Sequence, residues 1–253
     1  MQVLVYVDPK PRGEWALAMA GLLPAAAGVS LHLLATAEDH AADPALLERA
    51  RGRLGGGVRI TTRPGPAERA VAAEAAEHRY DLVVVPPAGR GAVARMLKGS
   101  RVASVVRSVR APVLVARRPA PRVERVLAGL SGRETTLAVL EAALAWEKGA
   151  ARASFLHVRP DVALPFAPAR DAATESSPDT DNVRAALAAR GREGDLALRD
   201  GPVVEELLDA FETGAFHLLV IGARAEQEAG FGREDVTERL LLGCPGPTLI
   251  VPR

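Results

Sequence analysis

The chain contains an internal repeat, and this repeat limits the possible folds more than any other feature of the sequence. Residues 80–117 read YDLVVVPPAGRGAVARMLKGSRVASVVRSVRAPVLVAR, and residues 216–253 read FHLLVIGARAEQEAGFGREDVTERLLLGCPGPTLIVPR. Each copy begins with an apolar run typical of a buried strand, continues through a glycine-containing turn and a helical segment, and ends in a second short apolar run. Because one supersecondary unit occurs twice, we expect two similar domains in one chain.

Three matches, in the same order along the chain, align the two halves. They pair Leu31-His32-Leu33 with Leu156-His157-Val158, Gly65-Pro66 with Gly201-Pro202, and Tyr80-Asp81-Leu82 with Phe216-His217-Leu218. Between the halves, residues 117–122 read RRPAPR, a composition typical of a linker. We therefore predict a first domain at residues 1–118 and a second at residues 122–253.

Short β-rich runs alternate with helical patterns in both halves, which is typical of βαβ units that form a parallel sheet. The predicted strands lie at residues 2–7, 29–35, 58–62, 82–85 and 113–115, and in the second half at residues 123–128, 153–158, 196–199, 218–221 and 247–251. The predicted fold class is therefore α/β, with two tandem Rossmann-like domains, each a five-stranded parallel sheet sandwiched by helices. Residues 159–182 contain four prolines and a polar run, which predicts a long, mobile loop.

Bulk composition argues against several classes of function. A net charge of +1 gives no strong field for nucleic acid or an anionic membrane, and an aromatic content of 4% is too low for base-stacking surfaces. A single cysteine, Cys244, excludes an internal disulfide and a cysteine-rich metal site. No apolar run reaches the roughly 18 residues that a membrane span needs, and the first residues lack the layout of a signal peptide. We expect a cytoplasmic protein that binds neither nucleic acid nor membrane.

Residues suited to a phosphorylated ligand follow two predicted strands of the first half. Asp8 comes after the first strand, and Gly89, nine further residues and then Gly99-Ser100 come after the fourth. Glycine lets backbone N–H groups approach phosphate oxygens, a helix N-terminus adds partial positive charge, and a hydroxyl adds a hydrogen bond. In open α/β sheets, ligands bind beyond the carboxyl ends of the strands, where these residues are predicted to lie.

With these residues and its two copies, the chain resembles the universal stress protein family in its tandem form. The resemblance covers nearly the whole chain apart from residues 160–182, and it implies an adenine nucleotide α-hydrolase-like fold in each half. Members that bind ATP carry an Asp after strand one, backbone contacts to the base from strand two, and a G-x2-G-x9-G-[ST] motif after strand four. The resemblance thus implies that the first domain binds ATP with Mg²⁺ through five residues: Asp8, Leu33, Gly89, Gly99 and Ser100. We identify no catalytic residue and no metal site formed by protein side chains alone.

Both halves depart from the family's motif. In the first half, Pro86 replaces the first glycine, and proline has no N–H to donate. In the second half, Gly222 keeps that glycine, but Ser131 replaces the Asp after strand one and Glu234-Asp235 replace the Gly-Ser pair. Two carboxylates there would repel a triphosphate. We therefore expect ATP in the first domain only.

Three functions remain open at this point. The protein could be a stress-response module that binds an adenine nucleotide and reports it to a partner, or a nucleotide-free scaffold that recognises other proteins. It could also be a slow ATPase, although the sequence shows no paired carboxylates and no Ser-His-Asp set beside the glycines. Asp8 could equally cap the first helix, and we interpret His32 and His157 as structural histidines.

The final strand of each half offers a way to join the halves. In the family these strands pair antiparallel across a twofold axis. The resemblance therefore implies that Pro112–Ala116 pairs with Pro247–Val251 inside one chain, which gives a monomer that imitates a dimer. Such pairing would protect two exposed sheet edges. Association of two whole chains into a homodimer is a further expectation.

Overall fold

The computed structural model describes residues 1–8, 12–23, 29–36, 52, 58–87, 105–106, 108–159, 177–223 and 236–252. By its internal contacts the chain divides into two compact units, one made of Met1–Val123 with Pro245–Pro252 and the other of Glu124–Cys244. The strand predicted at residues 247–251 thus lies in the first unit, although the sequence repeat groups it with the second half. None of the helices in these parts of the chain is long and apolar enough to cross a bilayer.

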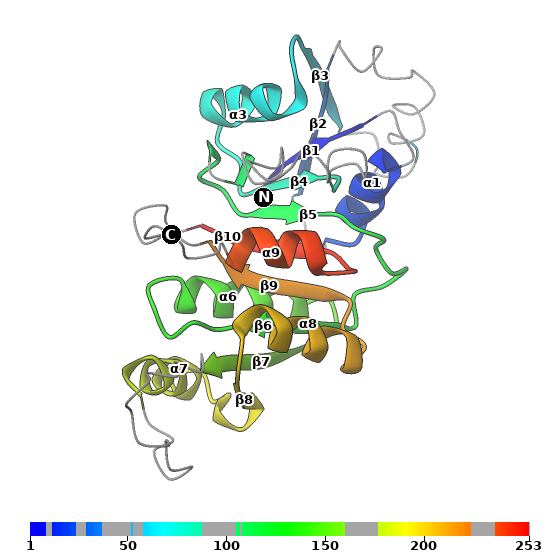
Figure 1. Cartoon of the computed structure of the whole chain (residues 1–253). Helices are drawn as coiled ribbons and strands as arrows, with labels where there is room; N and C mark the ends of the chain where they lie inside the picture. The colour runs from blue at the N-terminus through cyan, green and yellow to red at the C-terminus, as the bar shows by residue number, and fades with distance from the viewer. Residues whose placement is uncertain are drawn as a thin grey trace. The chain divides into compact units, whose positions relative to one another are not determined.

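The first unit is built on parallel strands in the order β3-β2-β1-β4-β5 (Figure 1). The chain moves outward from β1 to β3, and it then returns through a helix to β4 on the other side of β1. The strand order therefore reverses between β1 and β4, and this switch point is where α/β sheets bind ligands. The elements of this unit are β1 (Gln2–Tyr6), α1 (Gly13–Gly21), β2 (Ser30–Thr36), β3 (Arg59–Arg63), α3 (Ala67–Glu77), β4 (Leu82–Val85) and β5 (Val113–Val115).

A sixth strand, β10 (Thr248–Val251), completes the first unit. It pairs antiparallel with β5, with Thr248 opposite Val115 and Ile250 opposite Val113. All four residues of β10 are buried. The pairing that the sequence predicted between the two final strands is therefore confirmed.

The second unit repeats the architecture with parallel strands in the order β9-β6-β7-β8. Its order also reverses, between β6 and β9, so it has a switch point of the same kind. The elements are β6 (Arg125–Gly129), α6 (Thr136–Glu147), β7 (Arg152–Arg159), α7 (Pro178–Ala188), the short 3-10 helix η2 (Glu193–Asp195), β8 (Leu196–Asp200), α8 (Val203–Thr213), β9 (Leu218–Gly222) and α9 (Val236–Gly243).

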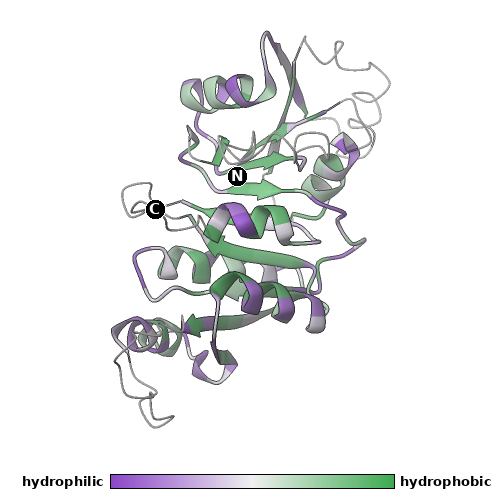
Figure 2. Ribbon diagram, viewed as in Figure 1, coloured by the Kyte–Doolittle hydropathy of each residue, from purple (hydrophilic) through white to green (hydrophobic). Residues whose placement is uncertain are grey.

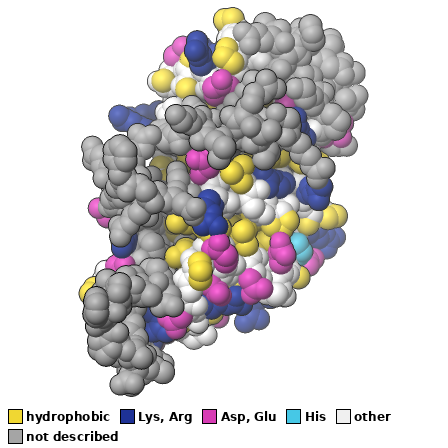
Figure 3. Space-filling model, in the orientation of Figure 1, with side chains coloured by type: hydrophobic (Ala, Val, Ile, Leu, Met, Phe, Trp, Pro, Cys, Tyr) yellow, Lys and Arg dark blue, Asp and Glu magenta, His cyan; other side chains and the backbone are white. Residues whose placement is uncertain are grey.

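Apolar side chains explain why these segments form strands and helices. Helices cover both faces of a parallel sheet, so its central strands are continuous apolar runs, as in the fully buried β4. Figure 2 shows hydrophobic colour along the strands and hydrophilic colour concentrated on the helices. Helix α8, for example, buries Val204, Leu207, Ala210 and Phe211, which recur at the spacing of one helical face. On the face shown in Figure 3, the acidic and basic side chains of the described residues are interspersed, in keeping with the net charge of +1.

The sheet register confirms two of the three sequence matches and corrects the third. The N–H of Val7 donates to the carbonyl of Leu34, and the equivalent N–H of Leu130 donates to the carbonyl of Leu156. Leu34 thus corresponds to Leu156, which makes Ser154 the counterpart of His32. The predicted match of His32 with His157 is wrong by three residues, because a short apolar-polar-apolar run fits any register of a buried strand.

The long loop predicted at residues 159–182 is also too long, because α7 begins at Pro178. Ser177 is the N-cap, and its hydroxyl accepts a hydrogen bond of 3.2 Å from the N–H of Thr180. Pro178 occupies the first helical position, where a missing N–H costs nothing. The helix predicted to start at Asp43-Pro44 lies outside the described residues.

Candidate functional site

Asp8 lies where the sequence predicted it, just beyond the carboxyl end of β1 at the switch point of the first unit. Its side chain is half-buried. The neighbouring helix α1 begins with Gly13, where an added Cβ would lie 1.7 Å from the carbonyl oxygen of Asp8. The absence of a side chain at Gly13 therefore lets the chain turn back tightly after β1, and this turn fixes the position of Asp8.

Leu33 lies in the middle of β2 and is fully buried. Its neighbours are Val5 on β1 and Ile60 on β3, so strands flank it on both sides. The residues of β2 closer to the switch-point edge are Ala35 and Thr36.

The glycine motif after β4 is described only at its start. Pro86 and Pro87 follow β4 directly and are both buried. Three of the predicted binding residues, Gly89, Gly99 and Ser100, lie outside the described residues. The structure thus places Asp8 and the start of the segment that carries these glycines at neighbouring strand ends, because β1 and β4 pair.

In the second unit, the glycine at the corresponding strand end has a packing role. Gly222 ends β9, and an added Cβ there would lie 2.1 Å from the hydroxyl oxygen of Thr135, just before α6. Gly132, with φ of +77°, is equally close to α7, since an added Cβ would lie 2.1 Å from the carbonyl oxygen of Asp179. The side-chain amide of Asn182 also donates to the carbonyl of Gly132 at 3.0 Å. Helix packing therefore accounts for both glycines without a ligand.

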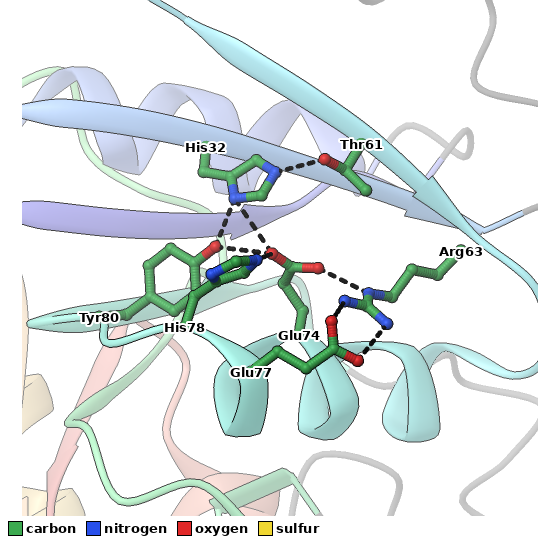
Figure 4. A network of polar contacts seen from close by, with 7 residues as sticks. All are labelled: His32, Thr61, Arg63, Glu74, Glu77, His78 and Tyr80. Carbon is green, nitrogen blue, oxygen red and sulfur yellow. Dashed lines mark hydrogen bonds and ion pairs between the residues drawn. The ribbon is translucent and has the colours of Figure 1, made fainter.

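A second polar site, not predicted from the sequence, lies toward the amino ends of the strands of the first sheet, away from Asp8 (Figure 4). Glu74 of α3 is only 1% exposed, and its carboxylate accepts hydrogen bonds of 2.6 Å from Nε of Arg63 and 2.9 Å from the hydroxyl of Tyr80. His32 of β2 is 4% exposed, and its Nδ1 lies 3.4 Å from the same carboxylate. Its Nε2 is hydrogen-bonded to the hydroxyl of Thr61 at 2.7 Å. We call His32, Glu74 and Tyr80 the buried triad.

The hydrogen bonds fix the proton positions in the buried triad. Because the hydroxyl of Tyr80 donates to Glu74, its oxygen accepts from Nδ1–H of His32, and Nε2 then accepts from Thr61. Burial lowers the pKa of His32 although Glu74 opposes this effect. Burial alone would raise the pKa of Glu74, but hydrogen bonds from Arg63 and Tyr80 outweigh it and hold that pKa below its ordinary value. At neutral pH the triad therefore holds a neutral imidazole beside an ionised carboxylate.

Glu74, Glu77 and His78 bring potential metal ligands within 4.8 Å of one another. Both carboxylates, however, are already bound by Arg63, whose NH1 donates to Glu77 at 2.9 Å. A cation would have to displace this guanidinium or lie against it. The ion pairs therefore explain the cluster without a metal.

Among the described residues of the second unit, the positions equivalent to the triad are mostly apolar. Ser154 corresponds to His32 through the β7 register, and Ala210 and Phe216 correspond to Glu74 and Tyr80 through the matches that the structure confirms. There Phe216 packs 6.5 Å from the ring of Phe211. The same fold thus forms with an apolar side chain at two of the three triad positions, so the fold itself does not require the buried triad.

Sequence reasoning missed the triad because its members lie far apart in the chain. His32 has no neighbouring ligand in the sequence, and Glu74 is one charge within the alanine-rich α3. One signal was available: α3 has a buried glutamate at a position where α8 of the second half has alanine. The match of Gly65-Pro66 with Gly201-Pro202 already aligns Glu74 with Ala210, and a correct register of the second strands would have added the contrast of His32 with Ser154.

Replacing His32 with glutamine is expected to flatten the pH dependence of stability in the first unit. The pKa of His32 is lowered from 6.5, so the folded state takes up its proton only at lower pH than the unfolded chain. Stability that His32 contributes above pH 6.5 is thus lost as the pH falls below that value. One proton limits this slope to about 1.4 kcal/mol per pH unit.

The two tryptophans provide the measurement, because Trp15 lies in the first unit and Trp146 in the second. Urea unfolding of a Trp146→Phe background, followed through Trp15, reports on the first unit from about pH 7.5 to about pH 5.5. Equal slopes with and without His32 would contradict the expected titration.

Comparisons with known proteins support the duplication. A model described as the universal stress protein family matches residues 3–117 and again residues 122–252. A functionally unknown protein from Pseudomonas aeruginosa PAO1 aligns over 99% of this chain and 92% of its own, with 17% identity and a TM-score of 0.76. A universal stress protein from Archaeoglobus fulgidus DSM 4304 aligns over 100% of this chain and 96% of its own, with 15% identity and a TM-score of 0.75. A search of curated proteins finds no match.

The fold alone does not decide the function. The cytoplasmic domain of a prokaryotic cation chloride cotransporter also aligns over 98% of this chain and 94% of its own, with 14% identity and a TM-score of 0.59. The function must therefore be inferred from the residues and geometry of particular binding or catalytic sites. The family, in contrast, follows from two matches that together span nearly the whole length, each on one half of the repeat. The chain belongs to the universal stress protein family and carries two of its domains in tandem.

Proposed function

We propose that the first domain binds ATP or a related adenine nucleotide, and that the protein reports this bound state to a partner in a stress response. One observation carries this inference. Asp8 and the segment that holds Gly89, Gly99 and Ser100 leave the sheet at the ends of β1 and β4, the adjacent strands that form the switch point. Ligands of α/β sheets bind at such points.

The residues at this edge suit a nucleotide chemically. The carboxylate of Asp8 can accept hydrogen bonds from ribose hydroxyls, and its place is fixed by the tight turn at Gly13. The N–H groups of Gly89 and Gly99 and the hydroxyl of Ser100 would face phosphate oxygens. Mg²⁺, when bound with ATP, would neutralise part of the phosphate charge. Pro86 donates no hydrogen bond, so backbone contacts to phosphate would begin after it.

Binding is proposed for the first domain only. In the second domain, Ser131 holds the place of Asp8, and Gly222 and Gly132 are used in packing Thr135 and α7. The proposal places the protein in the cytoplasm, and its single cysteine, Cys244, cannot form an internal disulfide. The antiparallel pairing of β5 with β10 supports the proposed dimer-like arrangement within one chain, and a homodimer would need a further surface.

Calorimetric titration of the intact protein with ATP and Mg²⁺ tests nucleotide binding. We expect about one equivalent of ATP with a Kd in the micromolar range, on the order of −8 kcal/mol. Gly99→Glu, which places a side chain and a negative charge in the phosphate segment, should abolish binding, and Asp8→Ala should weaken it at least about tenfold, the loss of one charged hydrogen bond. Arg69→Gln, an exposed change on α3, is the control and should bind as the native protein does.

The absence of heat and of a thermal shift at millimolar ATP would overturn nucleotide binding. The nucleotide-free scaffold would then be favoured, because the buried Pro86 already removes one N–H from the motif. Release of phosphate from ATP that depends on Asp8 would instead assign a slow ATPase.

A further inference from the structure

A pocket of about 260 Å³ opens beside the buried triad, at the edge of the first sheet opposite the proposed nucleotide site. Its lining comes from the amino ends of adjacent strands, since Gln2, Ser30 and Arg59 are the first residues of β1, β2 and β3. The segment before β4 completes it, and the remaining lining residues are His32, His78, Arg79 and Tyr80.

The residues that line this pocket include arginines but no acidic residue. Two arginines, Arg59 and Arg79, line it, and neither forms an ion pair within the part of the chain that the structure describes. Two carboxylates lie nearby: Glu74 and Glu77 both bind Arg63, as Figure 4 shows. The carboxylate of Glu74 also contacts the lining residues His32, His78 and Tyr80 from below. Asp81, which is not part of the lining, accepts a hydrogen bond of 2.7 Å from the N–H of Gln2. The lining itself therefore presents cations and neutral donors without a carboxylate.

The second domain supplies an internal comparison for these residues. By the same strand register, Asp195 corresponds to Arg59 and Ala215 to Arg79. The triad positions below them hold Ser154, Ala210 and Phe216. The second domain has arginines at other positions of the same end, because Arg125 corresponds to Gln2 and Arg152 to Ser30. Only the first domain places its two arginines beside a buried polar floor, and a ligand would explain this combination.

The volume of the pocket and the chemistry of its lining residues limit the class of ligand that it can bind. At about 30 Å³ for each water molecule, the pocket has room for roughly nine waters, and it is smaller than the roughly 300–1,000 Å³ of sites for drug-sized molecules. The volume therefore favours a small ion over a whole nucleotide. Guanidinium groups bind phosphate and carboxylate through paired hydrogen bonds, and two of them match a dianion better than a monoanion. The hydroxyl of Ser30 and the imidazole of His78 add further donors.

We propose that this pocket binds a small phosphate-class dianion, held by Arg59 and Arg79 over the floor formed by His32 and Tyr80. The buried triad keeps this floor in place because Glu74 fixes Tyr80, and Tyr80 fixes the ring of His32. The site is separate from the nucleotide site, which lies at the carboxyl ends of the same strands. It is also specific to the first domain.

Inorganic phosphate is the probe, titrated into the full chain at low ionic strength, where charged contacts are least screened. Binding is measured by calorimetry and by the shift of the His78 imidazole resonances. The double variant Arg59→Gln with Arg79→Gln should weaken phosphate binding at least about tenfold, as expected for the loss of charged hydrogen bonds. The matched control, Arg69→Gln with Arg110→Gln, removes two exposed arginines of the same domain that do not line the pocket, and it should bind phosphate normally.

Two further experiments distinguish phosphate binding at this pocket from binding at the proposed nucleotide site and from nonspecific electrostatic attraction. Gly99→Glu should keep phosphate binding, and acetate should bind at least about tenfold more weakly than phosphate because a monoanion forms fewer charged hydrogen bonds. Loss of phosphate binding in Gly99→Glu, with retention in the Arg59/Arg79 variant, would overturn the assignment by placing the anion in the glycine segment. Equal loss in the matched control, or no binding at millimolar phosphate, would also overturn it.

Discussion

Replacing Glu74 with alanine is expected to lower the free energy of unfolding of the first unit by about 3 kcal/mol. The carboxylate of Glu74 is buried and accepts hydrogen bonds from Arg63 and Tyr80. Its removal leaves the hydroxyl of the part-buried Tyr80, and the Nε of Arg63, whose side chain is 21% exposed, without their buried acceptor. Donors that lose a buried acceptor account for losses of stability of this order. Urea unfolding followed through Trp15, in the Trp146→Phe background, measures the change.

Glu77→Ala is the matched control for Glu74→Ala. The two glutamates lie three residues apart on α3 and bind the same guanidinium, but the side chain of Glu77 is 57% exposed. Exposed ion pairs contribute little because water solvates both charges. The variant should therefore unfold close to the native protein. Equal losses at the two positions would show that burial is not the cause.

The second domain suggests how the loss at Glu74 can be reversed. A triple variant, His32→Ser with Glu74→Ala and Tyr80→Phe, installs the three residues that the second domain has at these positions. It should recover part of the stability lost in Glu74→Ala, because Tyr80→Phe removes the hydroxyl that Glu74→Ala leaves without its acceptor. A triple variant less stable than the single one would contradict this account.

Lowering the pH should reduce the difference in the free energy of unfolding between the native protein and Glu74→Ala. The pKa of Glu74 is held below 4.5, so its ionised form is favoured in the folded state. The stability that the ionised carboxylate contributes is complete at neutral pH. It is lost as the pH falls below 4.5 and passes through the pKa of Glu74 in the folded state. The loss due to Glu74 begins near pH 4.5, whereas the loss due to His32 begins near pH 6.5.

Replacing Ile250 with alanine is expected to destabilise the first unit by about 3 kcal/mol, although Ile250 follows the whole second unit in the sequence. Ile250 is 1% exposed and lies on β10, opposite Val113 of β5. Truncation of a fully buried side chain removes its contacts and leaves a cavity. The loss should appear in the unfolding transition reported by Trp15, because β10 belongs to the first unit.

Two single-tryptophan variants show which unit the Ile250→Ala substitution destabilises. Trp146→Phe reports on the first unit and Trp15→Phe on the second, and the Ile250→Ala shift should be larger in the former. Leu242→Ala is the control, because Leu242 lies only eight positions earlier but is 42% exposed, and its change should stay within about 0.5 kcal/mol. A shift confined to the Trp146 signal would contradict the assignment of β10 to the first unit.

Sequence patterns predicted the strands because these depend on strong local signals, whereas the pairing of β5 with β10 was implied by the resemblance to the family. Buried parallel strands are continuous apolar runs, and each repeat ended in a short one. The Gly-Pro pairs before α3 and α8 were equally clear, since Gly65 and Gly201 both have positive φ and both precede the proline that caps a helix. Asp8 was placed correctly because it follows the first strand directly.

The buried triad and its pocket could not be predicted in the same way. They depend on the register of β2 against its neighbours, and β2 is buried on both faces, so it lacks the inward-outward alternation that would specify its register. Pairing with β1 and β3 decides among them, and it placed His32 three residues away from the position that the match with His157 implied. Ionisable side chains from three separate elements then meet at Glu74, a contact that exists only after the sheet has formed.

The pairing of β10 with β5 has a consequence for biosynthesis. The ribosome makes β5 roughly 130 residues before β10, which takes about 7–27 s at about 5–20 residues per second. Throughout that interval the nascent first domain has its other strands but presents the edge of β5 unpaired, and such edges invite contact with other chains. The first domain therefore reaches its final fold only after the second has been synthesised. A chaperone, or a helix of the growing chain, would be most useful to this protein during those seconds.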